Sequence, residues 1–399
     1  MARLNSRNGF YWENAFSRRL LNEREWLLMR LLFDRLEHPE KEKAVRYLTE
    51  HIDIDTENMN YMLMLSILGF QTNWYCFPAE AIPRLKGIHR YCQAHNVMGM
   101  PWLLGKVHTL QNAGIPVMFL KGLALRCYYN KNVPRMMYDY DIAVPRDRFR
   151  EAMTLLRSGD TVNKGSEEWS DTIVGKCSGI NVELDVHQWI FKEMSDQDDA
   201  VWKRALAIPF YDTEVLVLSP DDMFLHQLNT HAKNIIVQEM AENRMKWLFD
   251  CRSLLEDYPP DPKKLETYTQ EYGLGYIIRF MLSLLRNCFG EDPMIPVIKT
   301  QVQEREYGIW LKEMWNWGIE MEYTNKNRAE CLGHPFRPDS LFHYFRRNYY
   351  EYRVEKHWHA DKARTRNYLV YLTRSHGIKD LKSLRDYYKS RKALREEYL

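Results

Sequence analysis

The chain has 399 residues, of which 45% are hydrophobic and 28% charged, and its formal net charge is +2. A chain of this length can bury a large core and divide into about two or three domains. The near-neutral charge gives no bulk signature of a nucleic-acid-binding protein, and the aromatic content of 13% argues against a disordered chain.

The seven cysteines are scattered along the chain, and none belongs to a Cys-x-x-Cys pair. This spacing is typical of reduced thiols in a cytosolic protein and argues against a disulfide framework or a zinc site. The first residues lack the apolar stretch of a signal peptide, and no apolar run reaches the length of a membrane span. We therefore expect a cytoplasmic protein without a membrane partner.

The first part of the chain is predicted to be helical. Apolar residues recur at three- and four-residue spacing in segments 24–38, 57–71 and 82–114, which is the pattern of helices with one buried face. Asn and Gly at the end of the third segment supply a stop signal. The sequence thus predicts a helical N-terminal region over residues 1–112.

From residue 113 the pattern changes to short strands that alternate with short helices. The expected strands cover residues 117–120, 139–144, 172–177, 181–189 and 214–218. Ser178-Gly179 is a hairpin-turn signature, and helices are expected at 122–130 and 146–158. Residues 113–219 are therefore predicted to form a small mixed sheet with helices packed on it.

The rest of the chain returns to helical periodicity. Ser-Pro-Asp-Asp at 219–222 is a helix-start signature, because Ser caps, Pro fits the first turn and the acids face the helix dipole. We expect a helical domain over 220–298 and a basic, aromatic-rich helical C-terminal region over 299–399. From Leu341 onward, 15 Lys and Arg residues oppose 7 Asp and Glu residues. The predicted fold class is α+β, with a small mixed sheet flanked by N-terminal and C-terminal helical regions.

Acidic side chains gather on one face of two expected strands. Asp139 and Asp141 alternate with apolar residues on the first strand, and Glu183, Asp185 and His187 share a face of the second. Strands that each concentrate acid on one face repel each other when paired, and a bound cation is the simplest compensation. Carboxylate oxygens are the natural ligands of Mg²⁺.

Spacing alone does not decide this, because Asp-x-Asp also occurs at 53–55 and 196–198, where solvated surface is expected. Lys121-Gly122 adds context, since a glycine at a strand-to-helix turn lets backbone amides approach a phosphate near a helix N-terminus. A strand with a solvated face and an ordinary strand-to-helix turn remain the alternatives at this point.

In combination, five segments resemble the nucleotidyltransferase superfamily that shares the DNA polymerase β palm. They are more closely similar to an uncharacterised bacterial branch, the family-five nucleotidyltransferases. The matching segments are 113–125, 135–145, 182–189, 217–232 and 244–255, so that the resemblance covers roughly residues 80–290. Superfamily members commonly carry Gly-Ser or Gly-Gly at the turn where this chain has Lys-Gly.

The resemblance implies transfer of an NMP from an NTP, such as ATP, to a hydroxyl acceptor with release of pyrophosphate. It implies that Asp139, Asp141 and Asp185 are the catalytic residues and hold two Mg²⁺ ions, with Mn²⁺ as an alternative metal. By the same resemblance, Lys121 and Gly122 contact the nucleotide phosphates.

Arg135 is a further candidate for nucleotide binding. Glu183 is the alternative third acid, and His187 and Lys233 are candidates for contact with the acceptor or for a secondary role. His187 is equally expected to be a hydrogen-bonded structural histidine. The acceptor is open between a small molecule, a sugar, a protein and RNA, and the basic C-terminal region offers a possible contact with nucleic acid.

Three other functions compete with this prediction. In the first, the protein keeps the nucleotidyltransferase fold but has no catalytic activity and serves as a binding or accessory module. The second is a glycosyltransferase that uses Asp-x-Asp to hold a metal and a sugar nucleotide, but such an enzyme needs a large α/β half ahead of its acids. The third is a nucleic-acid-binding protein that works through its basic tail.

Overall fold

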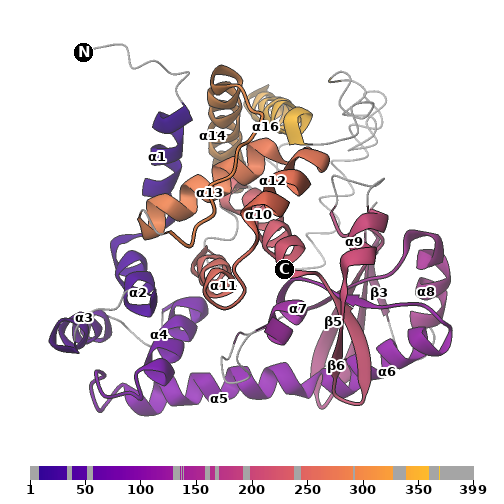
Figure 1. Ribbon diagram of the computed structural model, residues 1–399. Helices are drawn as coiled ribbons and strands as arrows, with labels where there is room; N and C mark the ends of the chain where they lie inside the picture. Colours follow the sequence, from indigo (N-terminus) through magenta and orange to yellow (C-terminus); the bar gives the residue numbers. More distant parts are fainter. Residues whose placement is uncertain are drawn as a thin grey trace.

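The structure is a computed structural model (Figure 1). It describes residues 9–33, 38–51, 57–128, 135, 137, 139–157, 162–166, 170–191, 198–237, 244–290, 293–326, 338–358 and 368. The Asp-x-Asp segment at 53–55 and most of the basic tail after residue 358 lie outside the described residues.

Six helices precede the first strand in the described part of the chain. They are α1 (Gly9–Leu20), α2 (Glu23–Phe33), α3 (His38–Glu50), α4 (Met59–Gln71), α5 (Ile82–Met98) and α6 (Met100–Asn112). The predicted helical character of this region is confirmed. α5 and α6 run along one side of the molecule and reach the sheet (Figure 1), so they connect the N-terminal helices to the α/β part.

The sheet has seven strands: β1 (Met118–Phe119), β2 (Tyr140–Ala143), β3 (Val162–Ser166), β4 (Ser170–Cys177), β5 (Ile180–His187), β6 (Leu206–Phe210) and β7 (Thr213–Val217). Their order across the sheet is β3-β4-β5-β2-β1-β7-β6. The pairs β2–β5 and β1–β7 are parallel and the other pairs are antiparallel. The prediction of a mixed α+β fold is confirmed.

The predicted hairpin is present between β4 and β5. Ser178 and Gly179 form its turn with φ angles of +50° and +83°, as a two-residue turn of this kind requires. In β5 the side chains of Val182, Leu184 and Val186 are buried, while Glu183, Asp185 and His187 alternate with them and are half-buried. The period-two pattern of the sequence therefore identifies the two faces of this strand correctly.

Two strands were not expected from the sequence, and both lie at the edges of the sheet. β3 reads Val-Asn-Lys-Gly-Ser, which lacks an apolar alternation, and β6 contains Pro209. Proline is tolerated on an edge strand because it has no N–H to donate to a neighbour. Edge strands need less apolar surface than central ones, which explains why periodicity did not reveal them.

Four helices accompany the sheet strands: α7 (Lys121–Tyr128), the 3₁₀ turn η1 (Arg146–Arg148), α8 (Phe149–Leu156) and α9 (Asp198–Arg204). The helices that follow are α10 (Pro220–Val237), α11 (Arg244–Asp257), α12 (Pro262–Glu271), α13 (Gly275–Phe289), α14 (Glu304–Lys326) and α16 (Pro338–Trp358). α10 begins at the predicted proline. No described helix combines the length and the apolar character needed to cross a bilayer.

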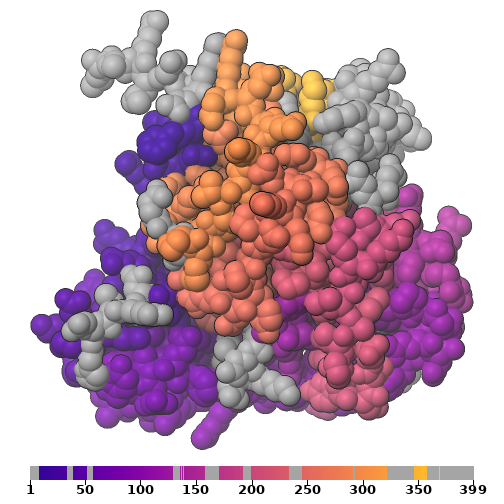
Figure 2. Space-filling model, in the orientation of Figure 1, coloured from indigo at the N-terminus to yellow at the C-terminus, as the bar shows by residue number. Residues whose placement is uncertain are grey.

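The N-terminal helix α1 packs against the helices α13 and α14 of the C-terminal half. Phe16 of α1 lies edge-to-face against Phe280 of α13, and Tyr307 of α14 donates a hydrogen bond to Glu13 at 2.7 Å. In the space-filling view the α12–α13 part of the surface, in orange, occupies the centre, with the N-terminal helices on one side and the sheet on the other (Figure 2). These contacts cross the expected boundaries at residues 112 and 219.

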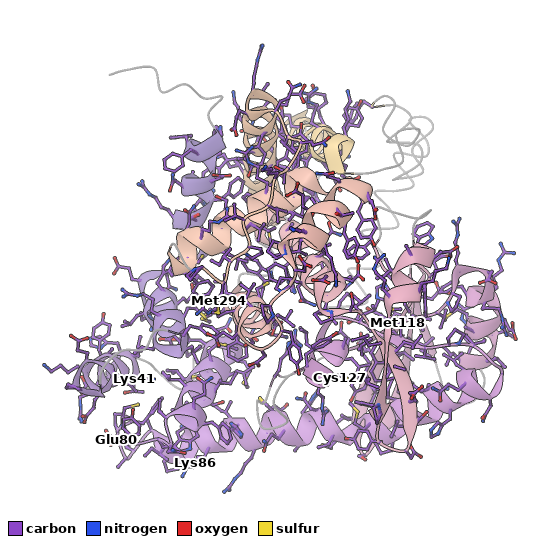
Figure 3. The ribbon with its side chains drawn as sticks, viewed as in Figure 1. Lys41, Glu80, Lys86, Met118, Cys127 and Met294 are labelled. Atoms are coloured by element: carbon purple, nitrogen blue, oxygen red, sulfur yellow. The ribbon has the colours of Figure 1, made fainter. Side chains whose placement is uncertain are left out.

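The core continues through the sheet. Met118 of β1 is fully buried in the α/β part of the molecule, whereas Lys86 of α5 is exposed and lies near the N-terminal helices (Figure 3). Burial of β1 by neighbours on both sides fixes the position of the turn that follows it. That turn carries the first residue of the site described next.

Candidate metal centre

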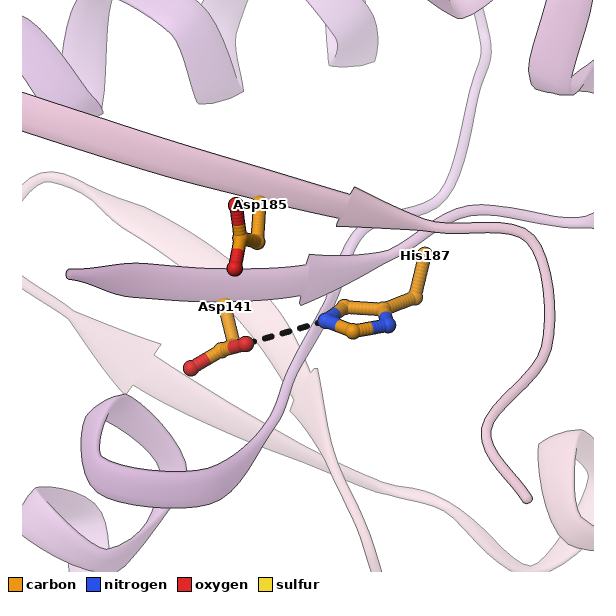
Figure 4. Close-up of side chains that lie close together, drawn as sticks. All are labelled: Asp141, Asp185 and His187. Atoms are coloured by element: carbon orange, nitrogen blue, oxygen red, sulfur yellow. Dashed lines mark hydrogen bonds and ion pairs between the residues drawn. The ribbon is translucent and has the colours of Figure 1, made fainter. Parts of the chain in front are cut away.

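The site is built on the parallel strands β2 and β5. Asp141 of β2 and Asp185 of β5 are direct Cα partners in the register of this pair. Because partners in a register point to the same face, the two carboxylates lie side by side (Figure 4). Asp141 is buried, with 2% of its surface exposed, and Asp185 is half-buried.

Asp141 is surrounded by groups that stabilise its ionised form. Its Oδ1 atom lies 2.5 Å from Lys121 Nζ and 2.9 Å from His187 Nε2. Burial alone would raise the pKa of Asp141, but the charge and hydrogen bond of Lys121, together with His187, outweigh this effect and hold the pKa well below its usual range. Asp141 is therefore a carboxylate, the form that binds a cation.

Lys121 is the first residue of α7, at the strand-to-helix turn after β1, and its conformation is strained. Its φ angle is +45°, in the left-handed region that residues other than glycine rarely adopt. Burial would lower the pKa of Lys121, but the neighbouring Asp141 raises it, so the side chain carries a positive charge. The strain is maintained at the position where the ammonium group reaches the buried carboxylate.

The absence of a side chain at Gly122 lets another group lie close to its backbone. That group is the side chain of Arg135, whereas the sequence suggested a phosphate. A Cβ atom at this position would collide with Nη1 of Arg135. Arg135 in turn donates to both carboxylate oxygens of Asp250 on α11, with Nε–Oδ1 at 2.9 Å and Nη2–Oδ2 at 2.8 Å. Both partners of this pair are buried, so the structure places Arg135 in a buried ion pair beside the turn.

The segment ahead of β2 is also held by α5. The side-chain amide of Asn96 donates to the carbonyl of Arg135 at 2.6 Å, and its oxygen accepts from the backbone N–H of Met137 at 3.0 Å. These two bonds satisfy buried backbone groups of the segment ahead of β2. They fix the course of the chain directly before Asp139.

Asp185 accepts a hydrogen bond on its other side. Thr172 of β4 donates from Oγ1 to Asp185 Oδ1 at 2.5 Å. Asp141, Asp185 and His187 each offer one ligand atom, and these atoms all lie within 4.8 Å of one another. This cluster can hold a metal ion through two carboxylate oxygens and one imidazole nitrogen.

Glu183 and Asp139 lie outside this cluster. Glu183 is opposite Val174 in the β4–β5 pair, two residues before Asp185. Asp139 is on a bend ahead of β2 and is exposed at its surface. Nevertheless, desolvation by the surrounding protein, and then the negative charge of Asp141, raise the pKa of Asp139. The ionisation of Asp139 is thus coupled electrostatically to the charge of Asp141.

Sequence reasoning missed Thr172 and Lys246. Burial, and then the nearby Arg135, lower the pKa of Lys246 on α11 to about 8, while Asp250 and Asp139 act in the opposite direction. Thr172 follows an acidic residue in an unremarkable β run, so no local signal marks it. Lys246 lies inside one of the five resembling segments, which is the signal that could have identified it.

Two histidines of α10 face the same region. Burial lowers the pKa of both His226 and His231 to about 3, and in each case nearby cations, among them Lys121, add to the effect. They are therefore neutral at physiological pH. Lys233 also belongs to α10, but its side chain is outside the described residues.

Comparison with known families decides the assignment. The family model described as "Uncharacterised nucleotidyltransferase" matches residues 67–290. The chain belongs to this family. No curated protein matches the chain. One similar solved structure is an antigenic nucleotidyltransferase-like protein from Paracoccidioides brasiliensis, with 16% identity, a TM-score of 0.36, and coverage of 52% of this chain and 94% of that one.

The match to this nucleotidyltransferase family extends beyond the sheet. It begins within α4 and ends after α13, so it includes α5, which carries Asn96, and α11, which carries Lys246 and Asp250. All residues of the cluster and of its supports fall inside the matched range. The family thus comprises the sheet together with the helices that hold its acidic face.

Proposed function

We propose that this protein is a metal-dependent nucleotidyltransferase. It transfers an NMP from an NTP to a hydroxyl acceptor and releases pyrophosphate. The observation that carries the proposal is the register of Asp141 against Asp185, with His187 completing a cluster of possible ligand atoms within 4.8 Å. A strand-to-helix turn at Lys121 ahead of this pair is consistent with a palm of the polymerase β type.

The residues of the cluster suit Mg²⁺, with Mn²⁺ as an alternative, because two of the three ligands are carboxylates. Asp141 is held in its ionised form, and Asp139, two residues away, would serve as a further ligand for a second ion. Two such ions would neutralise the triphosphate and lower the pKa of the attacking hydroxyl.

The chain's own cations support a polyanionic substrate. Lys121 is positively charged at the N-terminus of α7, where the helix dipole also favours an anion. Lys246 adds a second amine on the α11 side. Arg135 contributes indirectly, because its ion pair with Asp250 and its contact with Gly122 hold the turn in place. We propose ATP as the nucleotide.

The acceptor is a hydroxyl group whose carrier is a small molecule, a sugar, a protein or RNA. A glycosyltransferase is less favoured, because within the described residues only the two-residue strand β1 precedes the acidic strand β2. A nucleotide-binding half of α/β type is therefore not present ahead of Asp141 in the described chain. A catalytically inactive binding module is the alternative that the experiment must separate.

The test uses the purified full-length protein with Mg²⁺ and each of the four α-³²P-labelled NTPs. We expect release of pyrophosphate and transfer of label to an acceptor, including the protein itself. Asp141→Asn and Asp185→Asn should abolish both signals, whereas Asp212→Asn, an exposed change at the β6–β7 turn, should not. Nucleotide binding without pyrophosphate would indicate the binding module, and absence of both would refute the proposal.

A further inference from the structure

We propose that Thr172 is a positioning residue that orients the Asp185 carboxylate toward the metal ion. This inference rests on the proposed function, since it concerns the same metal centre. Thr172 is not among the acidic, basic or histidine side chains from which such a site is usually recognised. Its role follows from the hydrogen bond of 2.5 Å between its Oγ1 and Asp185 Oδ1.

The sheet places Asp185 between two partners. β5 lies between β4 and β2, and the registers pair Asp185 with Thr172 on one side and with Asp141 on the other. All three side chains therefore share one face. Thr172 engages Oδ1, so Oδ2 of Asp185 would remain to hold an ion together with Asp141.

The need for such a support comes from the freedom of a carboxylate. The final torsion of an aspartate is broad and lacks sharp staggered minima, so an unsupported carboxylate samples many orientations. Threonine is branched at Cβ, which restricts its first torsion. A hydrogen bond from a stiff donor therefore fixes the direction of both oxygens of Asp185.

Two effects of this bond oppose each other. Donation to Oδ1 withdraws some negative charge from the carboxylate and weakens its attraction for a cation. Orientation strengthens binding, because the ligand atom no longer has to be immobilised when the ion arrives. Loss of partners that orient metal ligands typically lowers metal affinity by about 10- to 100-fold, so we expect orientation to dominate.

The same hairpin contains an internal contrast. Glu183, the other acid on this face, is paired with Val174, which has no group to donate. The Thr172 hydroxyl lies opposite Asp185, which is the acid in register with Asp141. This arrangement distinguishes the two candidate third acids by their neighbours as well as by their register.

The test measures Mn²⁺ binding to the full-length protein by electron paramagnetic resonance, with and without a non-hydrolysable ATP analogue. Thr172→Val removes the hydroxyl and keeps the shape, and we expect it to weaken Mn²⁺ binding by about tenfold or more. Thr172→Ser keeps the donor but not the branched Cβ, and it should bind Mn²⁺ more tightly than Thr172→Val. The matched control is Thr213→Val on β7, which removes a strand hydroxyl bonded to Gln111 at 2.7 Å and should bind Mn²⁺ normally.

The outcomes separate the two proposals. If Thr172→Val binds Mn²⁺ as tightly as the wild type, or if Thr172→Ser is as weak as Thr172→Val, the positioning role is refuted while the metal centre stands. If the wild type binds no Mn²⁺, or if Asp185→Asn leaves binding unchanged, the metal centre itself is refuted and the positioning role with it. Should Thr172→Val fail to fold, Thr172→Ala is measured instead with the same expectation.

Discussion

Asp141 and Asp185 face each other across a parallel strand pair, with their Cα atoms in register. Like charges in such positions destabilise a sheet. Here Lys121 compensates Asp141 and Thr172 donates to Asp185. The two acids are thus supported from opposite sides, Asp141 by a charged group and Asp185 by a neutral donor.

The turn at Lys121 provides a first prediction. Lys121→Ala and Lys121→Gly both remove the ammonium group next to Asp141, but only glycine adopts a φ of +45° without strain. We expect Lys121→Gly to have the higher free energy of unfolding, by about 1 kcal/mol, and both variants to lose nucleotide transfer. Urea denaturation checks the stability, and equal midpoints for the two variants would contradict the strain.

The ion pair between Arg135 and Asp250 provides a second. Asp250→Ala leaves the Arg135 guanidinium buried without its bidentate partner, so we expect a loss of about 3–5 kcal/mol in the free energy of unfolding. The control is Glu151→Gln, which breaks the exposed pair with Arg148 and should not change stability measurably. An unchanged midpoint for Asp250→Ala would show that the pair contributes little.

His226 provides a pH-dependent prediction. Burial lowers its pKa to about 3 in the folded protein, whereas in the unfolded chain it titrates near 6.5. Below about pH 6.5 the unfolded chain therefore takes up a proton that the folded protein does not. Above that pH His226 does not reduce the free energy of unfolding. Between about pH 6.5 and pH 3 it lowers the free energy of unfolding by up to about 1.4 kcal/mol per pH unit.

The variant His226→Phe keeps a ring beside Phe191 and cannot titrate, so its free energy of unfolding should fall less steeply between pH 6.5 and 4.5. Urea denaturation at several pH values measures both slopes. His108→Gln, a change at a more exposed histidine, is the matched control for the loss of one imidazole from the chain. Parallel slopes for wild type and His226→Phe would mean that His226 protonates freely in the folded state.

Lys246 provides a prediction about reactivity. With a pKa of about 8, the Lys246 amine is neutral in roughly half of the molecules at pH 8. An ordinary lysine is neutral in under about one in a hundred. We expect an acetylating reagent to modify Lys246 ahead of the exposed Lys176, as read by mass spectrometry of peptides. Mg²⁺ with ATP should protect Lys246 and leave Lys176 unaffected. Modification at equal rates would place Lys246 in an ordinary solvated environment.

Local pattern predicted the elements of the site better than their pairing. The β4–β5 hairpin, the acidic face of β5 and the start of α10 at Pro220 all follow from periodicity and turn chemistry. The choice between Glu183 and Asp185 could not be made in this way, because only the register of β5 against β2 brings one acid level with Asp141. Register depends on contacts between segments that are distant in sequence.

Arg135 illustrates the same limit. As a cation ahead of an acidic motif it is a reasonable candidate for binding phosphate, and its sequence neighbours suggest nothing else. Its partner Asp250 is 115 residues further along the chain, and only the packing of α11 against the turn brings the two together. The sequence therefore identified Arg135 as a charged residue of the site but did not reveal that its ion-pair partner is Asp250.

Asn96 uses its side-chain amide as an adjacent strand would use its backbone, donating to Arg135 and accepting from Met137. A fragment that starts at residue 113 would retain every acid of the metal centre and yet lose this support for the chain ahead of Asp139. The shortest active fragment is accordingly expected to begin before α5. The minimal catalytic unit would then be a helix-and-sheet composite.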